Sequence, residues 1–86
     1  MATKWGPVIQ VPPGLWGKAG RDSDGNWHIM LAERKADVVN ADDDSGIEHF
    51  VKRGGKWWRY SDNVSMESTH SQLEGLLRQL TAAWEP

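Results

Sequence analysis

The 86-residue sequence contains no cysteine, one phenylalanine and one tyrosine, and no long run of apolar residues. The absence of cysteine excludes a disulfide framework and thiolate chemistry, and it favours a reducing compartment. No apolar run approaches the roughly 18 residues that a membrane-spanning helix requires. The opening MATKWGPVIQ also lacks the basic and apolar segments of a signal peptide. We therefore expect a cytoplasmic protein that makes no membrane contact.

The chain also lacks a strong net charge, which is −2 at pH 7. General nucleic-acid binding requires a net basic surface, so this class of function is disfavoured. The charges are nevertheless unevenly placed. Residues 36–48 hold five acidic and no basic residues, whereas residues 49–59 hold four basic and no acidic residues. An acidic loop therefore leads directly into a basic hairpin.

Six tryptophans are the most prominent feature of so short a chain. A chain of this length buries only about 60–65% of the surface that it exposes when unfolded, so its core is small. Each aromatic side chain can bury roughly 150–250 Å². A few tryptophans can therefore supply much of the core of one domain, which we expect to span residues 1–86.

The first three quarters of the chain has the signals of short strands joined by turns. Residues 5–11 are rich in β-branched side chains and end at a Pro-Pro-Gly turn, which predicts a first strand at a sheet edge. Residues 15–21 and 26–31 flank an Asp-Gly turn, which predicts a hairpin. Residues 32–39 fit either a short strand or a helical turn.

The register of this first hairpin stays open. A loop of two or four residues would place Trp16 and Lys18 beside Trp27 and Ile29. A loop of three residues would replace Trp16 and Lys18 by Ala19 and Gly17.

The end of the chain changes to a helical period. One stripe of a helix is formed by Leu73, Leu76, Leu77, Leu80 and Trp84. Thr69 and Gln72 have the spacing of a capping box, as do Ser71 and Glu74 one step later, so we predict a helix over residues 69–84. Gly75 costs up to about 1 kcal/mol relative to alanine within a helix, and we expect it to let the helix approach the sheet closely.

Strands followed by one helix indicate an α+β fold. We expect an antiparallel sheet of four to five strands, with two hairpins, over residues 1–65. The C-terminal helix would pack on one face of this sheet. A small SH3-like barrel with an appended helix is the alternative.

A second hairpin is predicted around Gly54-Gly55, because two glycines between strand-like segments are typical of a two-residue turn. Paired residues project to the same face of a hairpin. One face would carry Ile47, His49, Val51, Trp58 and Tyr60, and the other Glu48, Phe50, Lys52, Trp57 and Arg59. Because the first face is more apolar, we assign it to the core beneath the helix. Trp58 would then be a core residue, and Trp57 would not.

The second face predicts a binding surface. Trp57 opposite Lys52 and Phe50 opposite Arg59 are possible cation–π pairs, and Trp and Arg are enriched in binding hot spots. We predict a partner site centred on Trp57 with Lys52, Arg59 and Phe50. An electrostatic rim would be formed by Asp42, Asp43 and Asp44. The alternative is that Trp57 lies beneath another segment, such as the N-terminal strand.

Residues 45–68, SGIEHFVKRGGKWWRYSDNVSMES, resemble the closing hairpin of ubiquitin-specific proteases. In that family a Gly-His-Tyr precedes a strand, a Gly-rich turn, a Lys-Trp strand and an acidic residue. In this sequence Ile47 follows Gly46, and Asp62 falls near the acidic position. The chain has no cysteine to act as a nucleophile. The resemblance covers about a quarter of the chain, supports the hairpin and implies no activity.

Motifs for metal binding or catalysis are not found. His28, His49 and His70 have neither HxH nor HxxxH spacing, so no metal site is predicted. We expect His49 beside Tyr60 as a hydrogen-bonded structural histidine. An EF-hand that begins at Asn40 fails at its glycine and at its final glutamate. No nucleophile elbow or phosphate loop is present, so we expect no cofactor and no enzymatic activity.

Our leading hypothesis is a small non-enzymatic module that binds another protein. Its size and composition suit a phage or mobile-element protein, a viral protein that binds and inhibits host machinery. One alternative is a binder of saccharides or other small ligands that stack on tryptophan. Another is a structural subunit of a homo-oligomer or virion. Nucleic-acid binding would require the acidic loop to fold away from the basic hairpin.

Overall fold

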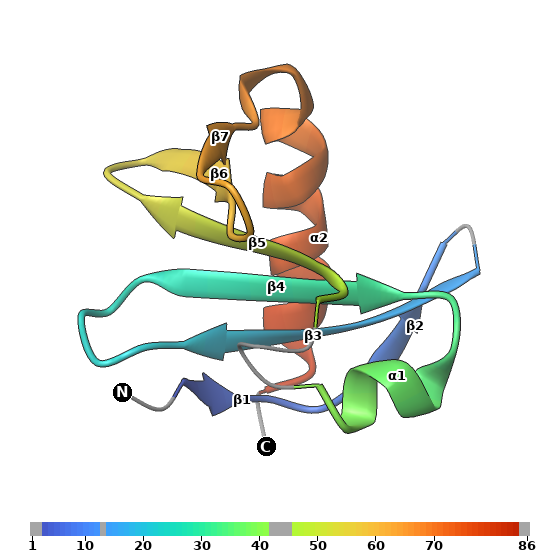
Figure 1. Cartoon of the computed structure of the whole chain (residues 1–86). Helices are drawn as coiled ribbons and strands as arrows, with labels where there is room; N and C mark the ends of the chain where they lie inside the picture. Colours follow the sequence, from blue (N-terminus) through green and yellow to red (C-terminus); the bar gives the residue numbers. More distant parts are fainter. Residues whose placement is uncertain (1–2, 13, 42–45, 85–86) are drawn as a thin grey trace.

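The computed structural model describes residues 3–12, 14–41 and 46–84 (Figure 1). An antiparallel sheet is crossed on one face by a single long helix, α2 (His70–Ala82), so the predicted α+β fold is confirmed. The sheet is open and not closed into a barrel. Within the described ranges, no helix is long and apolar enough to cross a membrane.

Seven short strands lie within the described residues, in the order β1-β3-β4-β5-β6-β7, with β2 also paired to β3. Their bounds are β1 Lys4–Trp5, β2 Ile9–Val11, β3 Leu15–Arg21, β4 Trp27–Ala32, β5 Glu48–Arg53, β6 Lys56–Arg59 and β7 Val64–Ser65. The number exceeds the predicted four to five for two reasons. The strand expected over 5–11 is interrupted at Gly6-Pro7-Val8, where proline cannot donate a ladder hydrogen bond, and β7 adds to β6.

The first hairpin has the register that the three-residue loop predicts. Ala19 pairs with Ile29 and Gly17 pairs with Leu31. The Asp22 backbone N–H donates to the Asn26 carbonyl at 3.1 Å and closes the loop. Residues 32–39 adopt the helical alternative, because Lys35–Val39 forms the short helix α1.

The second hairpin has the predicted register throughout. Arg53 pairs with Lys56, Lys52 with Trp57, and Val51 with Trp58. Gly54 and Gly55 have φ of +59° and +77°. Positive φ at both central positions is typical of the tight hairpin turn that matches strand twist, and it favours glycine at each position.

α2 follows a 3-10 turn, η1 (Glu67–Thr69), and the predicted leucine stripe faces the sheet with Leu73 and Leu80 buried. Neither predicted capping box forms, because the N-cap residue Thr69 makes no side-chain capping hydrogen bond and Ser71 lies inside α2. The Thr69 hydroxyl instead donates to the Met66 carbonyl at 3.3 Å, within η1.

Gly75 does not serve a close approach of α2 to the sheet, as the sequence had suggested. A β-carbon at this position would meet only the Arg78 guanidinium, at 3.9 Å. We therefore expect Gly75→Ala to raise the free energy of unfolding by up to about 1 kcal/mol, because alanine loses less backbone entropy on helix formation. Urea denaturation of both proteins measures this change. A destabilised variant would show that Gly75 has a packing role.

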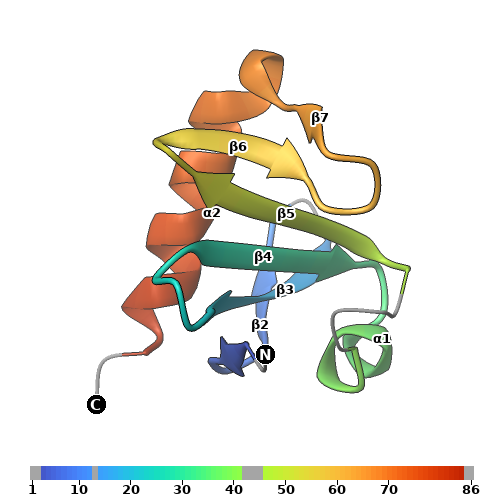
Figure 2. The same ribbon diagram turned by 60° about the vertical axis from the view of Figure 1, so that its left-hand side comes forward.

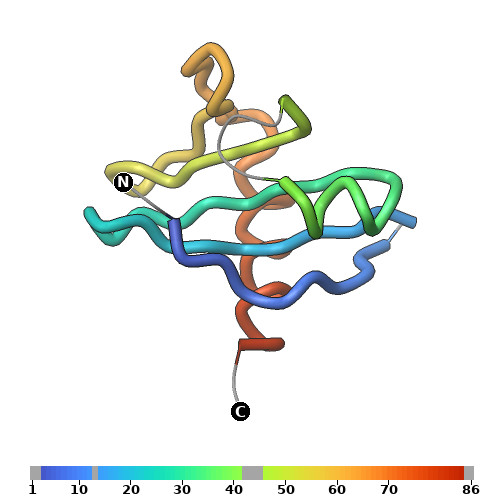
Figure 3. The backbone as a smooth tube through the Cα atoms, turned by 60° about the horizontal axis from the view of Figure 1, so that its bottom comes forward, coloured from blue at the N-terminus to red at the C-terminus, as the bar shows by residue number. Residues whose placement is uncertain are grey.

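The two faces of the sheet are covered by different elements. Figure 2 shows α2 packed on one face, and Figure 3 shows α1 in front of the sheet with α2 behind it. We call the face that α2 covers the helix face, and the opposite face, where α1 lies, the outer face. The main core lies on the helix face and comprises Val11, Ala19, Ile29, Leu31, Phe50, Trp57, Leu73 and Leu80. The outer face buries Lys18, His28, Met30, His49 and Val51.

The predicted assignment of the second hairpin's faces is therefore wrong. Trp57 is 1% exposed and lies in the main core, whereas Trp58 is half-buried on the outer face. The pairing of β5 with β4 explains the difference, because Phe50 pairs with Ile29 and so shares the most apolar face of β4. The face with His49, Val51 and Trp58, which is the more apolar within the hairpin, pairs with the face of β4 and β3 that carries His28 and Lys18.

Candidate functional site

The four residues of the predicted binding surface do not form an exposed aromatic patch. Trp57 and Phe50 are 1% and 7% exposed, so neither offers its ring to a partner. Lys52 forms an ion pair with Glu74 of α2, and Arg59 is exposed and bound to Asp62. The predicted rim, Asp42–Asp44, lies outside the described residues.

Trp57 is instead hydrogen-bonded to the helix α2. Its indole Nε1 donates to Glu74 Oε2 at 2.8 Å, and Lys52 Nζ lies 2.7 Å from the same oxygen. The Lys52 hydrogen bond lowers the pKa of Glu74, with the Trp57 hydrogen bond adding to it, against the opposing effect of burial. These contacts link β5, β6 and α2. The cation–π contact of this hairpin joins Arg53 and Trp58, with the guanidinium carbon 5.8 Å from the ring centroid.

A hydrogen-bonded relay crosses the outer face. Asp22 Oδ2 lies 2.8 Å from His28 Nε2, and His28 Nδ1 lies 2.8 Å from His49 Nε2. A carboxylate only accepts, so His28 donates through Nε2. When His28 is neutral, its Nδ1 accepts from the His49 Nε2–H, and when His28 is charged, its Nδ1–H donates to His49 Nε2. Asp22 Oδ1 accepts the backbone N–H groups of Asp24 and Asn26, at 2.9 Å each. The turn between β3 and β4 thereby fixes the first member of the relay.

Aromatic rings enclose the relay. The Tyr60 ring stacks on His49 with centroids 4.1 Å apart, and the Trp5 ring meets His28 and His49 edge-on at 6.0 and 5.8 Å. Trp5 lies directly over Gly20, where a β-carbon would come within 2.6 Å of the Trp5 ring. The prediction of a hydrogen-bonded histidine beside Tyr60 is confirmed, although on the outer face.

Burial lowers the pKa of one member of this relay, and hydrogen bonds lower the pKa of another. Burial and the nearby charges of His28 and Lys18 lower the pKa of His49 to about 4. Burial alone would raise the pKa of Asp22, but hydrogen bonds from His28, Asn26 and Asp24 outweigh it and lower the pKa. Neutral His49 beside an ionised Asp22 is a stable arrangement near pH 7. A base with so low a pKa is poorly matched to proton abstraction at that pH.

Two adjoining pockets of about 470 and 430 Å³ lie where β4 ends and β5 begins. They share Leu31, Ala32 and Glu48, and we name them together the strand-end groove. Its apolar lining comes from Leu15, Leu31, Ala32, Ile47 and Phe50, and its charged lining from Glu33, Glu48, Arg59 and Asp62. No described residue of α2 is part of this lining.

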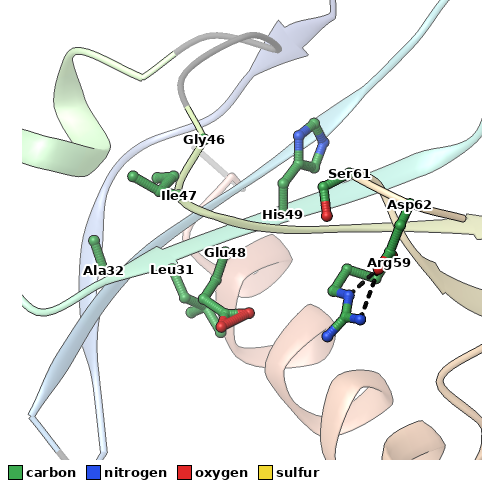
Figure 4. A pocket seen from close by; sticks show the side chains of 9 residues that line it. All are labelled: Leu31, Ala32, Gly46, Ile47, Glu48, His49, Arg59, Ser61 and Asp62. Carbon is green, nitrogen blue, oxygen red and sulfur yellow. Dashed lines mark hydrogen bonds and ion pairs between the residues drawn. The ribbon is translucent and has the colours of Figure 1, made fainter. Parts of the chain in front are cut away.

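The charged side chains of the strand-end groove are mostly acidic. Arg59 donates to both carboxylate oxygens of Asp62, at 3.0 and 2.8 Å, and these bonds raise the pKa of Arg59 and lower that of Asp62. Figure 4 shows Glu48 and Arg59 on one side of β5 and His49 on the other. Among the described residues, Glu33 and Glu48 take part in no ion pair. The groove therefore combines an apolar floor with two exposed carboxylates, Glu33 and Glu48, and the Glu48 carboxylate also attracts the Arg59 guanidinium.

Sequence reasoning missed the strand-end groove. Arg59 alone belongs both to the predicted surface and to the charged lining, and Phe50 contributes to its floor. The alternation of β5 places Glu48 and Phe50 on one face, but the position at which α2 crosses the sheet decides which part of that face stays open. No local pattern reports that position.

Other ligand classes receive no support from the described part of the chain. No group of three or more His, Cys, Asp or Glu side chains is arranged to hold a metal ion there. No tryptophan lines any of the four pockets described there, of which two form the groove. A stacking platform made of tryptophan is therefore not observed at these places.

Comparisons with known proteins add no functional assignment. No protein-family model matches the chain, and neither the curated proteins nor the solved structures include a significant match.

Proposed function

We propose that this protein is a small non-enzymatic module that binds a peptide segment of another protein in the strand-end groove. The observation that carries the proposal is an apolar groove beside α2 that the helix does not cover. Concave surfaces with an apolar lining and a few polar groups are the usual form of a binding site.

The position of the groove supports a peptide as the bound species. Its lining comes from the ends of β3, β4, β5 and β6 and from residues just before β5 and after β6, so it runs across several strands. Strand ends fixed by the sheet offer a rigid wall, and preformed sites lose little conformational entropy on binding. The area available is smaller than that of a standard protein interface, and we expect a weak complex with Kd of about 1–100 µM.

The proposal is tested by selecting a displayed library of random 12-residue peptides against the immobilised protein. Selected peptides are then titrated into the ¹⁵N-labelled protein. We expect amide shift changes to concentrate at the groove, at Leu15, Leu31, Ala32 and Glu48. A chain of this size gives spectra in which each of these amides can be followed.

The variant that tests the site is Ala32→Gln. Ala32 is half-buried and lines both pockets, so a longer side chain would occupy the space that they share. We expect the variant to remain folded by circular dichroism and to bind the selected peptides at least about tenfold more weakly. Failure to select any peptide, or shift changes confined to another surface, would contradict the proposal.

A further inference from the structure

We infer that the groove recognises a basic, apolar peptide segment, in which an apolar side chain is flanked by Lys or Arg. This inference rests on the proposed function, because it names the chemistry of the partner at the same site. An apolar side chain would enter between Leu15, Leu31 and Phe50. A neighbouring cation would lie against Glu33 and Glu48.

The apolar part of the groove sets the first requirement. Leu31 and Phe50 are each 7% exposed, so their rims form a floor but make no continuous exposed patch. Leu15 and Ala32 are half-buried and form the walls. A floor of this kind accepts a branched or aromatic side chain, whose transfer from water is favourable by area.

The carboxylates set the second requirement. Glu33 follows the end of β4 and Glu48 begins β5, and both belong to the same pocket. The one Lys or Arg in the described lining is Arg59, which is bound to Asp62 and also interacts electrostatically with Glu48. Three carboxylates and one guanidinium leave the groove with a net negative charge. Such a surface attracts basic segments and repels acidic ones, which fixes the sign of the partner.

The buried histidine does not change this sign near neutral pH. His49 lines the groove from the outer face, and burial keeps its pKa low. It therefore adds no positive charge that would compete with a basic partner. The chemistry favours Lys or Arg on the peptide over phosphate or carboxylate groups.

The test uses the peptides selected above that map to the groove. Their sequences are compared with the unselected library, and we expect Lys and Arg to be enriched beside one apolar residue. For one such peptide, a second version is synthesised with every Lys and Arg replaced by Gln. Because exposed charge pairs are weakened by salt, we expect the basic version alone to lose affinity as the salt concentration rises.

Neutralising variants of the protein provide the matched measurement. Glu33→Gln and Glu48→Gln should each weaken the basic peptide roughly 2–5-fold at low salt and leave the Gln version unchanged. Glu67→Gln is the control, because Glu67 is exposed in η1 and lies outside the groove lining. All three substitutions replace exposed side chains, so we expect each variant to remain folded.

The outcomes separate this inference from the proposed function. Groove-bound peptides without basic enrichment, or with equal affinity for the glutamine variants, would overturn the inference and leave the proposed function standing. Enrichment of acidic peptides would do the same. If no peptide binds at the groove, the proposed function fails and this inference fails with it.

Discussion

Replacing Trp57 by alanine should lower the free energy of unfolding by about 3–5 kcal/mol, the usual range for an aromatic side chain removed from a core. Trp57 is 1% exposed and also donates its indole N–H to Glu74, so the variant loses packing and leaves a carboxylate with one partner fewer. Domains of this size are stable by only about 5–10 kcal/mol. Urea denaturation followed by circular dichroism should therefore show a variant that is largely or partly unfolded in mild conditions.

Trp58→Ala is the matched control, because the same residue type stands next in the same strand. Trp58 is half-buried on the outer face, where its ring contacts Arg53. We expect its loss to cost about 1 kcal/mol, in the range of partly exposed side chains. Trp57→Phe should give an intermediate value, since it keeps a six-membered ring in the core but removes the five-membered part of the indole together with its N–H. Equal costs for the two alanine variants would contradict the assignment of faces.

The second large effect is a loss of stability on mild acidification, caused by His49. Its pKa is 6.5 when unperturbed and about 4 in the folded protein. The unfolded chain therefore binds more protons than the folded one between these two values. The stability contributed by neutral His49 is complete above about pH 6.5, falls as the pH drops towards 4, and is constant below that. The integrated loss is at most about 3 kcal/mol.

Other titrating groups act in a different range. Asp22 and Glu74 have pKa values lowered in the folded protein. Their contributions are therefore present above the ordinary carboxylate pKa and are lost as the pH falls through their lowered values. Their effect is concentrated below about pH 4.5, so the range between pH 5 and 6.5 reports on His49. The other titratable groups around its ring are Lys18, His28 and Tyr60.

His49→Gln isolates this effect. A glutamine amide can donate to His28 Nδ1 in place of the imidazole, but it does not titrate. We expect the urea midpoint of the wild-type protein to fall between pH 6.5 and 5, and that of the variant to stay nearly constant. The measured quantity is the change of the urea midpoint with pH. A loss of stability that is the same at every pH in the variant does not affect this comparison. His70→Gln, at the start of α2, should keep the wild-type slope. An unchanged slope in His49→Gln would assign the pH dependence to another group.

Local signals in the sequence account for most of the secondary structure. The Gly54-Gly55 dipeptide sets a two-residue turn, and the register of β5 with β6 follows from it. The leucine stripe sets α2, and the period-2 pattern around Ile29 sets β4. Boundaries were less predictable, because Thr69 lies in a 3-10 turn and proline at position 7 divides the first strand. Turn chemistry and side-chain period act within a few residues, so the chain itself reports them.

The sequence by itself determined the α+β class, the two hairpins, the register of the second hairpin and the C-terminal helix. Only the tertiary structure decided which tryptophan is buried, which pairing brings His28 to His49, and where α2 leaves a groove open. The second hairpin has aromatic and aliphatic residues on both faces, and its pairing with β4 selects the face that continues the apolar face of β4. That choice depends on the summed burial of residues far apart in the chain, which no single segment encodes.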